Sequence, residues 1–388
     1  MATAETELLI RTRRDLHQHP ELGFQEVRTA GIVAERLRAA GYDVRTGIAE
    51  TGVVGTMRGG NGDGPTLLLR ADMDALPIVE ETSHDFRSTI DGAMHACGHD
   101  AHTAIGLAVA ERLAANRHMW GGTVKYVFQP AEEGGQGALR MIEQGVLEGV
   151  DQALGLHVWM GLPSGIVGIT PGPFMASAGE FELVIRGRGG HGAMPEQTVD
   201  AVVAGSQVVM ALQTIVSRNV SPLESAVVTV GAFHAGSAQN VIADTATLIG
   251  TVRAFEVEAC EALPRRIETI AAGVCQAMGA TYEFHYTQDT PPTINDAAMA
   301  DLVRHAADEV VGADRVRFGA EVRTMAAEDF GEFLLRVPGC YFFVGARNEE
   351  RGQVHPHHNP RFDICEECMP VAVEVLERAA LRALNGEG

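Results

Sequence analysis

Short apolar segments alternate with helical segments along the N-terminal part of the chain, and this alternation limits the fold most narrowly. The expected strands are residues 53–57, 66–71, 123–128 and 153–158, and the expected helices between them are residues 101–115 and 138–148. Strands that are apolar along their whole length are typical of a sheet covered by helices on both faces. The pattern therefore predicts an α/β protein with a helix-flanked sheet.

The middle of the chain has a different order of elements. It gives strands at 181–186, 226–233, 246–255 and 281–286, with helices at 199–217 and 259–278. This β-α-β-β-α-β order is the split pattern of a ferredoxin-like domain, and the proline-containing segments 171–173 and 291–292 bracket it as linkers. A chain of 388 residues also favours two domains. We therefore expect a small domain of residues 178–290, inserted into a discontinuous domain of residues 1–177 and 291–388.

The ends of the chain complete the larger domain. Residues 5–40 have apolar positions at helical spacing, but His19-Pro20 interrupts this helix, because a proline disfavours a helical residue before it. Near the C-terminus the pattern predicts a helix at 296–311, a strand at 340–344 and a final helix at 370–384.

Composition limits the kinds of binding partner and the cellular location that we expect for the protein. The net charge of −21 argues against binding to nucleic-acid backbones or anionic membranes. No signal peptide is visible, and no apolar run approaches the roughly 18 residues that a membrane span needs. Six cysteines in a chain of this length do not indicate a disulfide framework. We expect a cytoplasmic protein without nucleic-acid or membrane partners.

Chemically reactive residues follow the expected strands. Asp72 and Asp74 come after 66–71, Glu132 and Glu133 come after 123–128, His157 ends 153–158, and histidines 355, 357 and 358 follow 340–344. In open α/β sheets, ligands bind at the carboxyl ends of the strands. The coincidence predicts a functional site at this edge of the sheet.

A cysteine and a histidine two residues apart suggest metal binding. Cys97 and His99 share a face in an extended chain, and a thiolate with an imidazole suits zinc, manganese, cobalt or nickel. The alternative is a buried cysteine beside a capping histidine. The presence of Glu133 and His157 at strand ends favours metal.

The adjacent carboxylates Glu132 and Glu133 suggest two different catalytic roles. They do not face one point in an extended chain, so one is expected to reach a metal while the other moves protons near the substrate. A metal lowers the pKa of its bound water from about 15.7 to about 7, and a positioned carboxylate then takes the proton. The alternative, a solvated acidic turn, is less consistent with Gly134-Gly135, which allows a close backbone approach.

Several candidates stay open on spacing alone. His355, His357 and His358 compete for one ligand role, while His95 and His102 are expected to act at most behind the ligands. In the inserted domain, His191 stands between glycines on an expected exposed turn. Asn240 and Arg253 are candidates for binding a substrate carboxylate, although Arg253 is equally consistent with a surface charge. Cys365 and Cys368 have redox-type spacing but are expected to begin the last helix.

Six segments together resemble the M20 metallopeptidase family, and specifically its amidohydrolase branch, which includes hippurate hydrolases, auxin-conjugate amidohydrolases and N-acetyldiaminopimelate deacetylases. The segments are Asp15-Leu-His-Gln-His-Pro-Glu-Leu-Gly-Phe24, Arg70-Ala-Asp-Met-Asp-Ala-Leu-Pro77, Met94-His-Ala-Cys-Gly-His-Asp-Ala-His-Thr103, Phe128-Gln-Pro-Ala-Glu-Glu-Gly-Gly135, Gly190-His-Gly-Ala-Met-Pro195 and His358-Asn-Pro-Arg-Phe-Asp363. The branch departs from many M20 peptidases in having Asp72 where they have a histidine.

The resemblance implies a zinc-exopeptidase-like catalytic domain with a mixed sheet, and a ferredoxin-like lid domain that mediates a homodimer or higher homo-oligomer. It implies two divalent metal ions per subunit, with manganese expected first and zinc, cobalt or nickel as alternatives. The implied ligands are Cys97, His99, Glu133, His157 and His358. Glu132 would be the general base and later the proton donor, and His191 would polarise the scissile carbonyl.

The implied reaction is hydrolysis of the amide bond in an N-acyl amino acid. Within enzymes, the alternatives are N-acetyldiaminopimelate deacetylation and dipeptide cleavage. Outside enzymes, the alternative is a metal-binding regulatory protein with a decayed site, although the full set of expected ligands and the base argues against decay.

Overall fold

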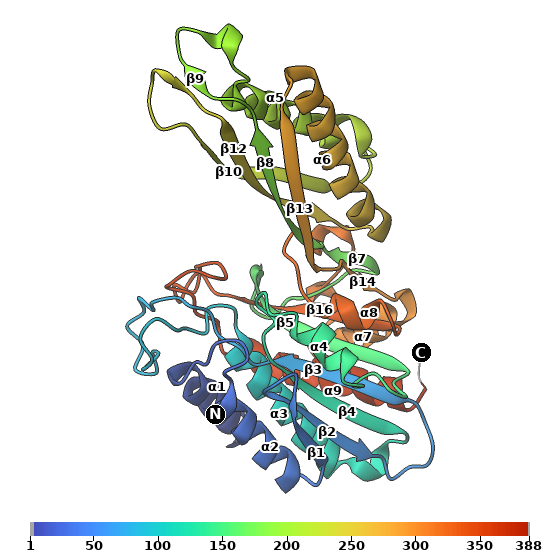
Figure 1. The fold of residues 1–388 in the computed structure, drawn as a ribbon. Coiled ribbons are helices and arrows are strands. Elements are labelled where there is room, and N and C mark those ends of the chain that lie inside the picture. Colours follow the sequence, from blue (N-terminus) through green and yellow to red (C-terminus); the bar gives the residue numbers. More distant parts are fainter. Residues whose placement is uncertain (1–3, 387–388) are drawn as a thin grey trace. The chain divides into compact units, whose positions relative to one another are not determined.

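The computed structural model describes residues 4–386, and the chain divides into two compact units (Figure 1). The first unit takes in the described chain up to Phe174, Ile294–Arg323, and the described chain from Asp329 onward. The second unit consists of Met175–Thr293 and Thr324–Glu328. The sequence pattern did not indicate that residues 324–328 belong with the second unit, because this short segment forms neither a helix nor a strand.

The first unit is built on an eight-stranded mixed sheet. In spatial order its strands are β1 (Asp43–Ile48), β2 (Gly52–Arg58), β4 (Thr123–Gln129), β3 (Thr66–Asp72), β5 (Gln152–Pro163), β16 (Gly339–Arg347), β6 (Val167–Ile169) and β15 (Val316–Phe318). The four central strands, β4, β3, β5 and β16, run parallel, so their carboxyl ends lie at one edge. The antiparallel pairs β1–β2, β2–β4 and β16–β6 make the sheet mixed.

Helices cover this sheet. They are α1 (Ala4–Gln18), α2 (Val27–Ala39), α3 (His99–Ala115), α4 (Gly137–Glu143), α7 (Ala297–Val311), α8 (Gly331–Leu334) and α9 (Cys368–Leu384). The expected break at His19-Pro20 separates α1 from α2. The expected helix at 138–148 is shorter, because Gly145 adopts a left-handed φ of 84° just after α4. Short 3-10 turns lie at Arg117–Met119, Pro195–Gln197, Ala313–Arg315 and Ala320–Val322.

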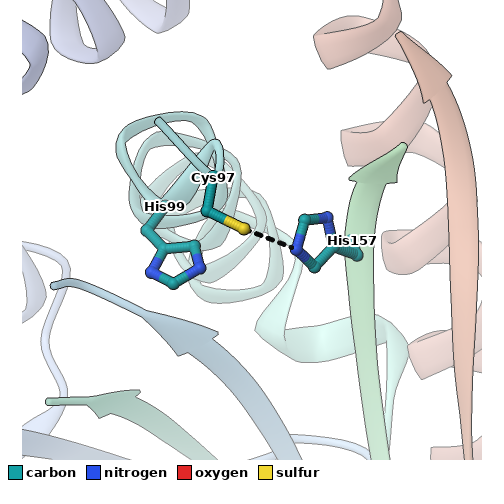
Figure 2. Close-up of side chains that lie close together, drawn as sticks. All are labelled: Cys97, His99 and His157. Atoms are coloured by element: carbon teal, nitrogen blue, oxygen red, sulfur yellow. Dashed lines mark hydrogen bonds between the residues drawn. The ribbon is translucent and has the colours of Figure 1, made fainter. Parts of the chain in front are cut away.

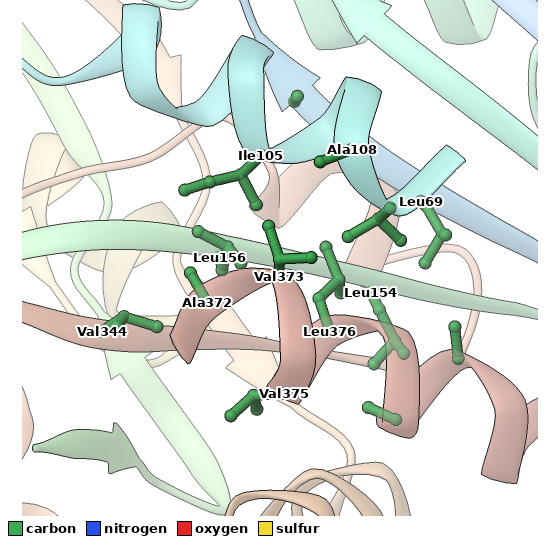
Figure 3. Packing of buried hydrophobic residues seen from close by; sticks show 14 of the residues in the cluster. Leu69, Ile105, Ala108, Leu154, Leu156, Val344, Ala372, Val373, Val375 and Leu376 are labelled. Carbon is green, nitrogen blue, oxygen red and sulfur yellow. The ribbon is translucent and has the colours of Figure 1, made fainter. Parts of the chain in front are cut away.

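The core of the first unit explains why its strands are apolar along their length. All but the first residue of β3 are buried, and all but the last residue of β16. Ile105 of α3 and Val373 and Leu376 of α9 gather over strand residues such as Leu69 and Leu154 (Figure 3). Burial of side chains from both α3 and α9 fixes the N-terminal end of α3 next to the strand ends.

The second unit is a separate four-stranded antiparallel sheet with two helices. Its elements follow the expected β-α-β-β-α-β order: β8 (Ala178–Arg186), α5 (Ala201–Thr214), β10 (Ala226–Ala235), β12 (Thr245–Ala254), α6 (Val257–Met278) and β13 (Thr281–Thr290), with spatial strand order β10-β12-β8-β13. Two small pairs complete the strands: β9 (Gly190–His191) with β11 (Val241–Ile242), and β7 (Gly172–Met175) with β14 (Thr293–Asn295). The ferredoxin-like prediction is confirmed.

One expectation about apolar runs was wrong. Among the described residues, the helical stretch Ala201–Asn219 has the length and composition of a membrane span. Its apolar character has a structural cause, because Ala204, Val208 and Leu212 are fully buried in the core of the second unit. Polar residues on the outer face of the helix interrupt the apolar run, so the sequence pattern does not reveal it.

Candidate metal centre

The expected reactive side chains meet at the carboxyl ends of the central parallel strands. Asp72 ends β3, Glu132 and Glu133 follow β4, and His157 lies in β5, which continues to Pro163. His99 begins α3, and His358 lies in the loop after β16. The predicted site at this edge of the sheet is therefore formed within the first unit.

Three overlapping groups of potential ligand atoms form the site. In each group the atoms lie within 4.8 Å of one another; the groups are Cys97 with His99 and His157, Cys97 with Glu133 and His358, and His99 with Glu132 and Glu133. Figure 2 shows the Cys97 sulfur directed at the His157 ring, with 3.5 Å between Sγ and Nε2. Because Cys97 belongs to two groups, the arrangement offers two neighbouring cation positions with one shared thiolate.

Gly98 brings Cys97 and His99 to the same place. Its φ of 95° is left-handed, which turns the chain between the two side chains at the start of α3. A Cβ on Gly98 would stand 2.5 Å from Cγ2 of Val158. Only glycine fits, so the spacing that suggested a ligand pair depends on this residue and not on an extended chain.

A tight turn after β4 directs both glutamates inward. Ala131 has a φ of 50° and Gly134 a φ of 80°, so the segment is not extended. The Ala131 N–H donates to Glu26 Oε1 at 2.9 Å, which anchors the turn. The expectation that Glu132 and Glu133 face different points was wrong in this respect, because both carboxylates reach the same group as His99.

Asp74 orients two members of the site. Its Oδ1 accepts from His99 Nδ1 at 3.1 Å, which directs Nε2 of His99 toward the cluster. Its Oδ2 accepts the Glu133 N–H at 3.0 Å. Asp74 is therefore hydrogen-bonded to a candidate ligand histidine, as expected of a strand-end carboxylate.

Asp72 and His102 are engaged elsewhere. Asp72 Oδ1 accepts from His102 Nδ1 at 2.7 Å, and the other Asp72 oxygen binds the buried guanidinium of Arg70. His102 Nε2 accepts the Val158 N–H at 2.9 Å. Although Asp72, His99 and His102 also lie close together, His102 has no free nitrogen for a metal.

The structure separates the three C-terminal histidines. His358 Nε2 lies 2.9 Å from Glu133 Oε1, and the His358 amide donates to Ala96 O at 2.8 Å. His357 Nε2 accepts the Met160 N–H at 3.1 Å, so His357 is not in a ligand group. His355 is likewise in none of the groups found among the described residues. His95 is buried, and neither ring nitrogen has a hydrogen-bond partner in the described chain.

The surroundings of Cys97 and His99 favour the protonated forms of both side chains. Burial and the carboxylates of Glu133, Glu132 and Asp72 raise the pKa of the Cys97 thiol well above its usual value. Burial opposes the charged form of His99, but Asp72 and Asp74 outweigh it and raise the pKa of His99 to about 10. Burial holds the pKa of His157 well below its usual value.

The Nε2 atom of His99 fits a bound cation. It is buried and has no hydrogen-bond partner in the described part of the chain. It belongs to the ligand groups, whose thiolate, imidazole and carboxylate donors suit borderline divalent metals. An unsatisfied buried polar atom is costly, and a cation beside it would remove that cost.

The remaining candidates lie in the second unit. His191 on β9 is exposed, and its Nδ1 accepts the Ala193 N–H at 3.1 Å. Asn240 belongs to the same hairpin, since its carbonyl accepts the Gly192 N–H at 2.8 Å. Arg253 in β12 donates to Val252 O at 2.9 Å and to the Thr251 hydroxyl. The roles of these three residues stay predictions.

Comparisons with known proteins identify the family of the chain. The model of peptidase family M20/M25/M40 matches residues 68–382. The chain is 40% identical over 378 residues to N-acetylcysteine deacetylase of Bacillus subtilis (strain 168), covering 97% of both chains. It is 39% identical over 384 residues to IAA-amino acid hydrolase ILR1-like 4 of Arabidopsis thaliana, covering 97% of this chain and 86% of the relative.

A solved structure extends the likeness to three dimensions. The Bacillus subtilis YXEP protein, described as a dinuclear metal binding peptidase from the M20 family, superposes with a TM-score of 0.84 at 36% identity. The match covers 98% of this chain and 99% of that one. The strand-end site, the fold and the sequence matches together show that this chain belongs to peptidase family M20/M25/M40.

Proposed function

We propose that the protein is a metal-dependent amidohydrolase that cleaves the amide bond of N-acyl amino acids. The observation that carries this proposal is the position of Glu132 beside two ligand groups that share Cys97. The named activities of two relatives, an N-acetylcysteine deacetylase and an IAA-amino acid hydrolase, support this substrate class.

Five side chains would hold two divalent metal ions: Cys97, His99, Glu133, His157 and His358. We expect manganese first, as the family resemblance implies, with zinc, cobalt and nickel as alternatives that mixed thiolate, imidazole and carboxylate donors also suit. Bound ions would polarise the acyl carbonyl and make a water molecule acidic near neutral pH.

Glu132 would carry the protons of the reaction. One of its carboxylate oxygens, Oε2, lies 3.9 Å from His99 Nε2, so it borders the ligand groups. Glu132 would accept the proton of the attacking water and later deliver it to the nitrogen of the departing amine. The leaving group then departs as a neutral amine, and the carboxylate of Glu132 is regenerated.

The second unit would contribute substrate contacts. We assign His191 to polarisation of the scissile carbonyl, and Asn240 or Arg253 to the free carboxylate of the substrate. The exposure of His191 and Asn240 on one hairpin supports their availability for a ligand. Arg253 has weaker support, because its guanidinium already has local partners.

We also propose that the protein is cytoplasmic and that it forms a homodimer through the second unit. The outer face of α5 exposes Val203 and Met210, at 47% and 68% of their full accessible surfaces, and β10 is an edge strand of its sheet. Sedimentation velocity should show a dimer, and Met210→Lys should shift it toward monomer. A wild-type monomer at all concentrations would contradict the dimer alone.

The test of the function uses protein stripped by a chelator and reloaded with one metal at a time. Manganese, cobalt, nickel and zinc would each be added before an assay for free amino acid from N-acetyl, N-benzoyl and N-acetyldiaminopimelate substrates and from dipeptides. We expect metal-dependent release from N-acyl amino acids. Tight metal binding without hydrolysis of any of these substrates would refute the proposed activity. Selective turnover of dipeptides would show that dipeptides, and not N-acyl amino acids, are the substrate class.

A further inference from the structure

Two histidines beside β5 accept backbone hydrogen bonds in the same way. The Val158 N–H donates to His102 Nε2 at 2.9 Å, and the Met160 N–H donates to His357 Nε2 at 3.1 Å. Residues 158 and 160 are two apart, so their N–H groups lie on one edge of the strand. β3 pairs with β5 only as far as Gly155, which leaves later N–H groups on that edge without a strand partner.

These backbone bonds fix the tautomers of both imidazoles. A ring nitrogen that accepts an N–H carries no proton, so the proton of the neutral ring must be on Nδ1. For His102 that proton faces Asp72 at 2.7 Å. For His357 it faces the sulfur of Cys97, with 3.9 Å between Nδ1 and Sγ. The second contact joins a residue outside the ligand groups to Cys97, which two of the groups share.

The ring of His357 has little freedom to turn away. It stacks on Trp159, with ring centroids 4.7 Å apart and planes at 27°, and contacts Phe362 at 5.1 Å. The ring of His157 meets it edge-on at 5.0 Å. The backbone bond and these three rings therefore define the direction of the Nδ1–H.

We propose that His357 is a positioning residue whose Nδ1–H donates to the thiolate of Cys97. This inference rests on the proposed metal centre. The sulfur lies near the carboxylates of Glu132 and Glu133, which disfavour its negative charge. A fixed donor beside the sulfur offsets that effect and holds the thiolate where both ligand groups include it.

The test compares two amide substitutions with opposite geometry. His357→Asn places an amide N–H near the position of Nδ1, whereas His357→Gln places its amide near Nε2 and leaves the sulfur without a donor. Both remove the aromatic ring equally. His355→Gln is the matched control, because His355 lies two residues away and outside the ligand groups.

The readout is cobalt(II) binding to the full chain, followed by the sulfur-to-cobalt charge-transfer absorption and by chelator competition. Loss of a hydrogen bond raises the energy of the sulfur electrons, so His357→Gln should shift the band to longer wavelength. It should also weaken cobalt binding by about 10- to 100-fold. His357→Asn should keep the wild-type band position, and His355→Gln should match wild type in both measurements.

Equal band positions in His357→Gln and His357→Asn would overturn the donor role, whatever the affinities. The absence of a sulfur-to-cobalt band in the wild type would overturn both this inference and the proposed metal centre. Hydrolysis does not enter the readout, so a failed substrate assay with an intact band would count against the proposed reaction and leave the donor role standing.

Discussion

Metal binding should release two protons from the protein near pH 8. Asp72 and Asp74 raise the pKa of His99 to about 10 despite burial, and burial with Glu133 raises the pKa of Cys97 well above its usual range. Both ligands therefore hold a proton in the metal-free protein at this pH. A metal requires the deprotonated thiolate and the neutral imidazole, so filling the position formed by Cys97, His99 and His157 must displace both protons.

The magnitude follows from the two protons. Between pH 7.5 and 8.5 the apparent affinity should rise about 100-fold, because each proton contributes about 1.4 kcal/mol per pH unit. The affinity falls as pH falls, since a raised pKa favours the protonated, metal-free state. His157 contributes no proton, because burial lowers its pKa and it is already neutral.

The assay is competition with a chelator of known pH dependence, with zinc or cobalt, at several pH values. Calorimetry in buffers of different ionisation enthalpy counts the released protons independently. Cys97→Ser should reduce the slope to about one proton, since the remaining raised ligand is His99. A wild-type slope near zero would refute the account of the site's electrostatics.

Three further changes test other parts of the structure. Asp74→Asn replaces one of two acceptor oxygens, so we expect about 10- to 100-fold weaker metal binding in chelator competition; unchanged affinity would remove Asp74 from the account. Leu376→Ala should lower the free energy of unfolding by about 2–5 kcal/mol in urea because Leu376 is buried, whereas exposed Leu335→Ala should change it by less than about 0.5 kcal/mol; equal effects would contradict the assigned core. Arg13→Met leaves the carboxylates of Asp100 and Asp363 without their buried partner, so it should cost about 3–5 kcal/mol in urea at pH 7; a neutral result would contradict the ion network.

Much of the fold follows from periodicity. The apolar runs of β3 and β4 and the β-α-β-β-α-β order have local causes, since buried strands and amphipathic helices leave distinct patterns in sequence. The end of the helix after β4 depends on one left-handed glycine, Gly145, which periodicity does not reveal. The membrane-like composition of Ala201–Asn219 likewise has its explanation in tertiary packing.

The location of the candidate site could be predicted from the sequence, but the hydrogen bonds and side-chain directions within it could be predicted only in part. Strand ends indicated where Glu132, Glu133 and His157 would gather. Residue spacing did not separate His357 from His358, and only the family resemblance favoured His358, because the difference lies in a backbone N–H of Met160 that is distant in sequence. The inward direction of both glutamates depends on the left-handed φ of Ala131. A left-handed φ is uncommon at a non-glycine residue, so the sequence does not predict it. Arg70 was also missed, although an arginine inside an apolar strand was a signal for a buried ion pair.

The central claim is that Glu132 moves the proton for amide hydrolysis while other side chains hold the metals. The most direct test measures bound metal and turnover of an N-acetyl amino acid on the same samples of wild type and Glu132→Gln. We predict equal metal content and a loss of kcat of at least about 100-fold in the variant. Near-wild-type turnover by metal-loaded Glu132→Gln would contradict the account.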